Sequence, residues 1–223
     1  GLVAGASKGE GLGNQFLAHI RETDAIAQVV RCFENENVTH VEGSIDPLRD
    51  IEIIMTELGL ADLDAVAKRR QRIEKVAKSG NKEAKAELDV LRKVEACLSE
   101  GKPARLVELT PEEEALIREL NLLTRKPVLY VANIGEDEIS DPLANPHVVR
   151  VKELAESEGA QWVTISAAIE AEIAELSPEE AKVFLEDLGE EEAGLDRLIK
   201  AAYSLLGLIN FFTAGSDECR AWT

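Results

Sequence analysis

The stretch PVLYVAN, residues 127–133, is an apolar run that ends on Asn133 and is followed by Ile134, Gly135 and Glu136. A short run of this kind, rich in β-branched and aromatic residues, predicts a strand that is buried on both faces of a parallel sheet. Residues 25–33 and 162–165 form two similar runs. Helical patterns separate the three runs, and this alternation predicts an α/β fold in which helices flank a parallel sheet. Ligands of such sheets bind at the carboxyl ends of the strands.

A long helical pattern begins at Asp46 and Pro47, where Asp suits a helix cap and Pro suits the first helical turn. Apolar residues recur at helical spacing along two stretches, 51–76 and 88–98, and the turn signal Ser79-Gly80-Asn81 separates them. Two apolar stripes joined by a tight turn predict an antiparallel helical hairpin. Because it lies between the predicted strands, we interpret it as an insertion into the α/β domain.

Two further helices carry capping signals. Thr110-Pro111-Glu112-Glu113 and Ser177-Pro178-Glu179-Glu180 each combine an N-cap residue, a proline in the first turn and a Glu three residues after the cap. This is the pattern of a capping box, in which the two side chains satisfy backbone N–H groups at the helix start. We expect the first of these helices to run to about Leu123.

The composition fits a globular chain of the cytoplasm. A length of 223 residues with 45% hydrophobic residues is enough to bury a core without disulfide or metal staples. Three Cys, odd in number and far apart, fit a reducing compartment. No apolar stretch is long enough to span a bilayer core. The sequence opens at Gly1 inside a glycine-rich loop, so we expect it to be an internal piece of a longer protein.

Charge is unevenly distributed along the chain. The formal net charge is −18, yet residues 68–105 contain twelve Lys and Arg and six Asp and Glu, a net charge of +6. We predict that this segment binds RNA through phosphate contacts with a salt-sensitive affinity, led by Lys68, Arg69, Arg70 and Arg72. A solvated pair of charged helices without a binding role explains the same pattern, and this alternative stays open.

Three short motifs fall at strand ends or in loops: Gly1-Leu2-Val3, residues 133–136, and Ser166-Ala167-Ala168. Taken singly, they have ordinary explanations, such as a turn Asn or a Ser that caps a helix. In order and spacing they resemble the G3, G4 and G5 elements of P-loop GTPase-type domains. Longer segments resemble the YchF/Obg-like ATPase family over nearly the whole chain: GLVAGASKGEGLGNQFLAHIRE, DPLRDIEIIMTELGLADL, EGKPAR, KPVLYVAN and FFTAGSDECRAWT.

The resemblance implies roles for these motifs. Gly1 would be the glycine whose backbone N–H faces the γ-phosphate, and a glycine permits that close approach. Leu2 would stand where related enzymes have a Gln that orients the attacking water, which Leu2 is unable to do. Asn133 would contact the purine edge and Ile134 would pack on or beside the ring. The loop over the base would consist of Ser166, Ala167 and Ala168.

The resemblance also implies a preference for ATP over GTP. The guanine-reading element of this superfamily is N-K-x-D, in which the Asp carboxylate makes a bidentate contact with the base. Glu136 is one methylene longer than that Asp, and Ile134 replaces the Lys. Both changes weaken the selection of guanine.

Other expected parts are missing from the sequence. The phosphate-binding loop GxxxxGK[ST], with its Lys and its Mg²⁺-ligating Ser or Thr, is absent and would lie upstream. The sheet would then be incomplete, and this chain alone would be inactive. The implied cofactors are ATP and Mg²⁺, with K⁺ as a further candidate, and the implied partner is the ribosome or its subunits. The implied domains are 1–45 and 105–207 for the G domain, 46–104 for the hairpin, and 208–223 for the start of a TGS-type domain.

Two other functions remain open. In the first, the chain is a non-catalytic module that binds the ribosome or RNA through its hairpin. In the second, the parent protein is a GTPase.

Overall fold

The computed structural model describes residues 12–35, 44–215 and 218–223. The strands are β1 (Ile26–Arg31), β2 (Val128–Asn133), β3 (Gln161–Ile165), β4 (Phe211–Ala214) and β5 (Cys219–Trp222). The helices are α1 (Leu12–Arg21), α2 (Pro47–Lys78), α3 (Lys82–Ser99), α4 (Pro111–Ile117), α5 (Pro146–Glu158), α6 (Ala167–Ile173), α7 (Pro178–Leu188) and α8 (Gly194–Leu205).

The contacts divide the chain into two compact units. The helical unit comprises Gly1–Ile26 and Arg49–Lys126, and the sheet unit comprises Ala27–Leu48 and Pro127–Thr223. The domain boundaries expected from the resemblance stay a prediction.

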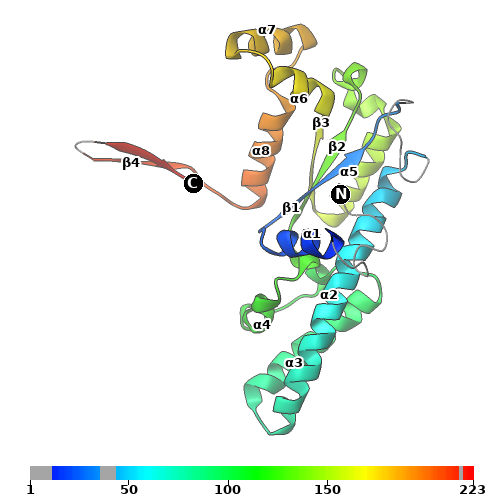
Figure 1. Ribbon diagram of the computed structural model, residues 1–223, viewed down its shortest axis with the longest axis vertical. Coiled ribbons are helices and arrows are strands. Elements are labelled where there is room, and N and C mark those ends of the chain that lie inside the picture. The colour runs from blue at the N-terminus through cyan, green and yellow to red at the C-terminus, as the bar shows by residue number, and fades with distance from the viewer. Residues whose placement is uncertain (1–11, 36–43, 216–217) are drawn as a thin grey trace. The chain divides into compact units, whose positions relative to one another are not determined.

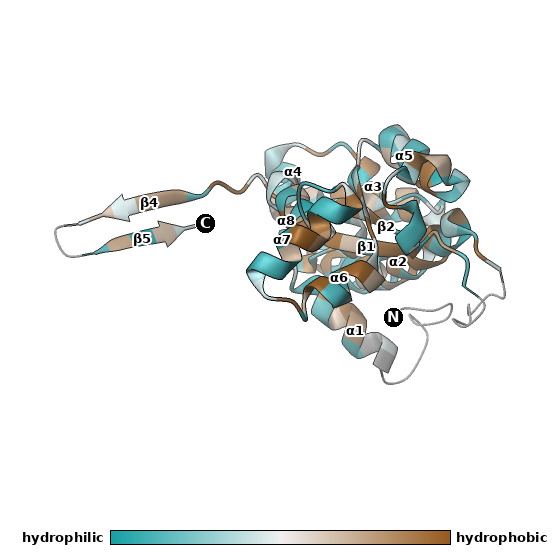
Figure 2. Cartoon of the chain, turned by 90° about the horizontal axis from the view of Figure 1, so that it is seen from above, coloured by the Kyte–Doolittle hydropathy of each residue, from teal (hydrophilic) through white to brown (hydrophobic). Residues whose placement is uncertain are grey.

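The sheet unit is built on β1, β2 and β3, which pair in that order. β2 runs parallel to β3, with Asn133 opposite Ile165 at the carboxyl end. Residues 128–132 are all buried, as expected for a strand covered on both faces. Helices α5 and α8 pack against β2 and β3 (Figure 1), and β2 is mostly apolar (Figure 2). The predicted α/β architecture with parallel pairing and flanking helices is therefore confirmed.

The helical unit contains two helices that lie side by side, α2 and α3, joined by Ser79-Gly80-Asn81 (Figure 1). At the start of α3, the Asn81 side chain accepts a hydrogen bond from the N–H of Ala84. Apolar residues of α2, α3, α4 and the following segment form one cluster of buried side chains: Val66, Val90, Leu91, Val94, Leu98, Ala104, Ile117 and Leu122. This shared core makes the hairpin and α4 one packed body.

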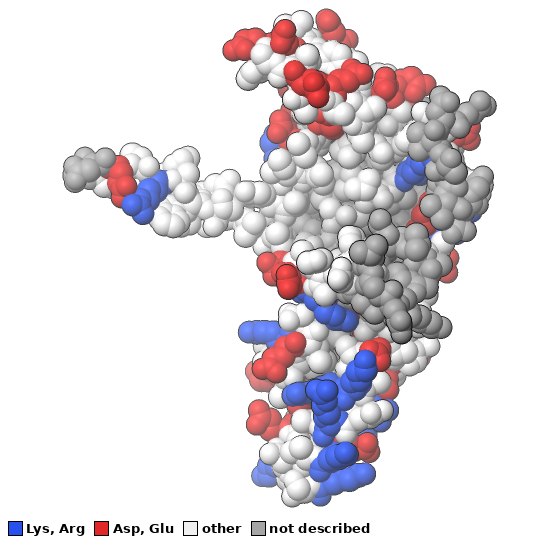
Figure 3. All heavy atoms as spheres, in the orientation of Figure 1, with Lys and Arg blue, Asp and Glu red and all other residues white. Residues whose placement is uncertain are grey.

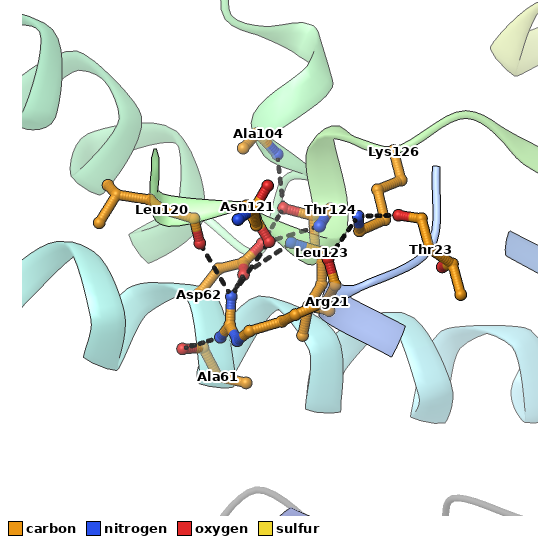
Figure 4. A network of polar contacts seen from close by, with 10 residues as sticks. All are labelled: Arg21, Thr23, Ala61, Asp62, Ala104, Leu120, Asn121, Leu123, Thr124 and Lys126. Atoms are coloured by element: carbon orange, nitrogen blue, oxygen red, sulfur yellow. Dashed lines mark hydrogen bonds and ion pairs between the residues drawn. The ribbon is translucent and has the colours of Figure 1, made fainter. Parts of the chain in front are cut away.

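A buried carboxylate connects α2 to two distant segments of the helical unit (Figure 4). Asp62 is fully buried and accepts hydrogen bonds from the N–H groups of Leu123 (2.9 Å) and Thr124 (2.7 Å) and from the Thr124 hydroxyl (2.8 Å). A guanidinium nitrogen of Arg21 lies 3.3 Å from the same carboxylate. Arg21 also donates to the carbonyl oxygens of Ala61, Leu120 and Asn121. The end of α1 and residues 120–124 are thereby held against the middle of α2.

The helix that begins at Thr110 is shorter than expected. Its capping box forms as predicted, but α4 ends at Ile117 and a 3₁₀ turn follows over Arg118–Leu120. Asn121 then adopts a left-handed conformation with φ of 45°. The expectation that this helix reaches Leu123 was therefore wrong, because the chain turns so that Leu122 and Leu123 enter the core and residues 123 and 124 reach Asp62.

Strands β4 and β5 form a separate antiparallel pair in which every residue is exposed. That these residues open a TGS-type domain stays a prediction. Within the three described ranges, no helix is both long and apolar enough to cross a membrane.

Candidate functional site

The carboxyl ends of β2 and β3 bring two of the three sequence motifs together. The side-chain oxygen of Asn133 accepts a hydrogen bond from the N–H of Ala167 at 3.0 Å. One residue further, the N–H of Ile134 donates to the carbonyl of Ile165 at 2.9 Å. Parallel pairing of neighbouring strands thus joins two loops that are about thirty residues apart in the sequence.

These loops line a cavity of about 360 Å³. Its volume falls in the range of about 300–1,000 Å³ that is usual for small-molecule sites. The lining contains every described residue that was predicted to bind nucleotide: Asn133, Ile134, Glu136, Ser166, Ala167 and Ala168. Ile134 is buried, whereas Glu136, Ala167 and Ala168 are exposed. The structure places these residues together; their role stays a prediction.

Ser166 has an unusual environment. It precedes α6 as the N-cap residue, yet its side chain makes no capping hydrogen bond. The residue is only 4% exposed, and its hydroxyl has no hydrogen-bond partner among the residues that the structure describes. A buried hydroxyl without a partner costs free energy. Helix capping therefore does not explain why a serine occupies this buried position.

Asn145 holds the turn after β2 in place, and sequence reasoning missed it. Its amide nitrogen donates to the carbonyl of Cys32 at 2.6 Å and to the Glu138 carboxylate at 2.7 Å. The same Glu138 carboxylate accepts from the N–H of Gly135 at 2.8 Å. The Asn145 oxygen caps α5 by accepting from the N–H of His147. A sequence signal existed, because Asn before Pro is a typical helix start, but the contact with Cys32 joins residues 113 apart.

Phe33 also lines the cavity and was not predicted to do so. It follows β1, and the guanidinium carbon of Arg31 lies 4.7 Å from the centre of its ring. The Arg31 Nε donates to the carbonyl of Phe33 at 3.0 Å, which fixes the turn. The available signal was an aromatic residue directly after a predicted strand, and it is weak without the spatial context.

The remaining predicted residues do not line this cavity or are not described by the structure. Gly1 and Leu2 are outside the described residues. On α2, Lys68 lies 2.6 Å from Asp64, Arg69 2.5 Å from Glu87, and Arg70 2.7 Å from Glu95. Arg72 is exposed and has no acidic partner in the described part of the chain. Three of the four cations predicted to bind a partner are thus engaged within the helical unit.

Across residues 12–35, 44–215 and 218–223, no group of three or more His, Cys, Asp or Glu side chains is arranged to hold a metal ion.

A parallel sheet with loops converging on a cavity at its carboxyl edge defines an α/β domain with a candidate ligand site. No family model matches the sequence. The whole chain is 54% identical to the ribosome-binding ATPase YchF of Bacillus subtilis and 57% identical to that of Haemophilus ducreyi, and it covers 61% of each relative. Among solved structures, the Schizosaccharomyces pombe YchF GTPase matches 96% of the chain, with a TM-score of 0.82 and 36% identity, over 58% of that protein.

Over its full length the chain is homologous to the YchF proteins of these two bacteria. It spans about three fifths of the length of these curated relatives, 61%.

Proposed function

We propose that the cavity at the ends of β2 and β3 binds the purine base of ATP, and that the protein containing this chain hydrolyses ATP to ADP and phosphate and acts on the ribosome. The single observation that carries the proposal is the convergence of Asn133 with the loop 166–168 around one cavity. The bacterial relatives, named ribosome-binding ATPases, support the reaction and the partner.

The geometry of Asn133 supports a purine ligand. Because its oxygen is occupied by the N–H of Ala167, its amide nitrogen is the group left to donate to a base. The N7 atom of a purine is an acceptor in both adenine and guanine. Asn133 would therefore select purines without distinguishing between them. Ile134 and Phe33 would provide apolar and aromatic walls for the ring.

Two further features favour adenine. The O6 atom of guanine needs a donor, and the N–H of Ala167 is already bonded to Asn133. Glu136 lines the cavity but is exposed and one methylene longer than the Asp of a guanine-reading element. A site that leaves polar groups of a base unpaired discriminates strongly against that base. We therefore propose that ATP is preferred over GTP.

The other parts of the mechanism are proposed from the family. Gly1 and Leu2 would lie at the γ-phosphate, and the phosphate loop and the Mg²⁺ ligands would come from outside these 223 residues. K⁺ is a further candidate cation. Catalysis would rest on positioning and charge stabilisation. The protein would work in the cytoplasm. Residues 46–104 would form an insertion in the G domain, whose sheet is incomplete in this chain, and residues 208–223 would begin a TGS-type domain.

Competition between ATP and GTP in the protein that carries this chain tests the proposal. We expect ATP to displace a fluorescent ATP analogue at lower concentration than GTP does. Asn133→Ala should weaken the binding of both nucleotides. Asn210→Ala is the control, because the Asn210 side chain lies outside the cavity lining, and it should weaken the binding of neither nucleotide. Glu136→Asp should raise the affinity for GTP relative to the affinity for ATP. Stronger binding of GTP by the unaltered protein would refute the base-reading argument.

Specific observations keep two alternatives in view. The fission-yeast relative is called a GTPase, and this name favours GTP hydrolysis. The basic hairpin favours a non-catalytic module that binds the ribosome or RNA. Nucleotide turnover by the 223-residue chain, compared with that of a version extended upstream, separates the enzyme from the module.

A further inference from the structure

Most Lys and Arg side chains of residues 68–102 fall into two groups according to their partners, and Arg72 is an exposed cation outside both groups. One group is paired with nearby carboxylates: Lys68 with Asp64, Arg69 with Glu87, Arg70 with Glu95, Arg92 with Asp89, Lys93 with Glu113 and Lys102 with Glu100. In these pairs the positive charge is locally neutralised. A phosphate group that approached such a pair would also meet the negative partner.

The second group consists of Lys75, Lys78, Lys82 and Lys85, which we name the tip cations. Three of them, Lys75, Lys82 and Lys85, have no acidic partner in the described ranges of the chain, and all four are exposed. Lys78 has only a contact of 3.9 Å with Glu74, and its side chain is 77% exposed. Together with Arg72, the tip cations thus carry most of the positive charge of the basic segment that nearby carboxylates do not neutralise.

The backbone brings the tip cations together. Lys75 and Lys78 belong to the last turn of α2, and Lys82 and Lys85 belong to the first turn of α3. Residues three apart share a helix face, so each pair projects from one side of its helix. The turn of three residues between the helices then places both pairs at the same end of the hairpin. Figure 3 shows Lys and Arg side chains gathered over the α2–α3 hairpin.

The tip is also well ordered by its own contacts. Ala77, Ala84 and Leu88 pack into a small buried cluster with Ile73. The Ser79 hydroxyl donates to the carbonyl of Val76 at 2.7 Å. A ligand that binds here therefore meets a preformed backbone and orders only the lysine side chains.

We propose that the tip cations bind the phosphate backbone of RNA. This inference rests on the proposed function, because it identifies the surface with which the protein would meet the ribosome. RNA is favoured over an acidic protein because Val76, 44% exposed, is the one large hydrophobic side chain that is strongly exposed in residues 72–85. That segment also contains no aromatic residue. Protein interfaces need an apolar, often aromatic, centre, whereas phosphate contacts need unpaired cations.

Two variants with the same change in net charge test this assignment. The tip variant carries Lys75→Gln, Lys78→Gln, Lys82→Gln and Lys85→Gln. The control variant carries Lys68→Gln, Arg92→Gln, Lys93→Gln and Lys102→Gln, which removes four cations that have acidic partners. Gln is a good helix former, and we expect both variants to keep the helical circular dichroism spectrum of the wild type.

We would measure the affinity for an RNA duplex of about 16–20 base pairs by fluorescence anisotropy. The measurement would be repeated at KCl concentrations between about 50 and 200 mM. Each phosphate contact contributes about 0.9 to the slope of log affinity against log salt for B-form DNA, and an RNA duplex is expected to behave similarly. We expect the tip variant to lose about 3–4 from this slope, and the control variant to lose less than about 1.

Equal slopes for the two variants would overturn the proposal, and so would an undiminished slope in the tip variant. If the tip variant keeps its affinity for RNA but no longer binds a ribosomal protein, the surface binds protein instead. That result also overturns the proposal. Failure of the proposed function would look different. In that case nucleotide competition or ribosome co-sedimentation of the wild type fails, while the tip and control variants still differ in their RNA slopes.

Discussion

Replacing Asp62 by Ala should destabilise the helical unit strongly. The change removes the acceptor for two backbone N–H groups, those of Leu123 and Thr124, at a position that is fully buried. A buried donor left without a partner costs about 1–3 kcal/mol, so the two donors together cost about 2–6 kcal/mol. Loss of the ion pair with Arg21 adds less to the destabilisation, because Arg21 is partly exposed and keeps three carbonyl acceptors (Figure 4).

Denaturation by urea, followed by far-UV circular dichroism, measures the loss in the free energy of unfolding. Trp162 and Trp222 both belong to the sheet unit, so tryptophan fluorescence in the same samples reports that unit separately. Hydrogen exchange at the amides of Leu123 and Thr124 reports the local effect, and both should lose protection.

Asp64→Ala is the matched control, two residues further along α2. Its carboxylate is 62% exposed and pairs with Lys68, and an exposed pair of this kind contributes about 0–1 kcal/mol. If Asp62→Ala and Asp64→Ala differ by less than about 1 kcal/mol, and the two amides keep their protection, the reasoning about the buried carboxylate is wrong.

Three further predictions concern the same unit. Burial raises the pKa of Asp62, although its hydrogen bonds with Thr124 and Leu123 and the charge of Arg21 act in the opposite direction. Because the pKa is raised in the folded state, protonation of Asp62 stabilises the fold. This stabilisation is complete below the pKa of the unfolded chain and is lost as the pH rises through the folded pKa. The unfolding free energy of the wild type minus that of Asp62→Asn should therefore fall between acidic and neutral pH, and a rise would show that the hydrogen bonds outweigh burial. Leu91→Ala, in the fully buried hairpin core, should cost about 2–5 kcal/mol in urea denaturation. Thr110→Ala removes the N-cap of α4 and should cost about 0.5–2 kcal/mol, with no change in tryptophan fluorescence.

The cavity at the strand ends was partly predictable from sequence. Apolar runs that end on Asn133 and Ile165 mark two strands, and parallel strands bring their carboxyl ends to one edge. Phe33 and Asn145 were missed because their places depend on contacts with residues about a hundred positions away, such as the bond from Asn145 to Cys32.

What the sequence alone determined is local. The capping boxes at Thr110 and Ser177 form as predicted, because each joins a side chain to a backbone group three residues away. The buried strand 128–133 follows from a run of apolar residues that are stable only inside a core.

The tertiary structure decided the features that depend on distant partners. It ended α4 at Ile117 and placed Asn121 in a left-handed turn, since the segment after it has to reach the carboxylate of Asp62. It also paired Lys68, Arg69 and Arg70 with acids while leaving lysines at the hairpin tip unpaired. A sequence states how many charges a segment carries, but the packing of helices against one another decides which of those charges remain available to a ligand.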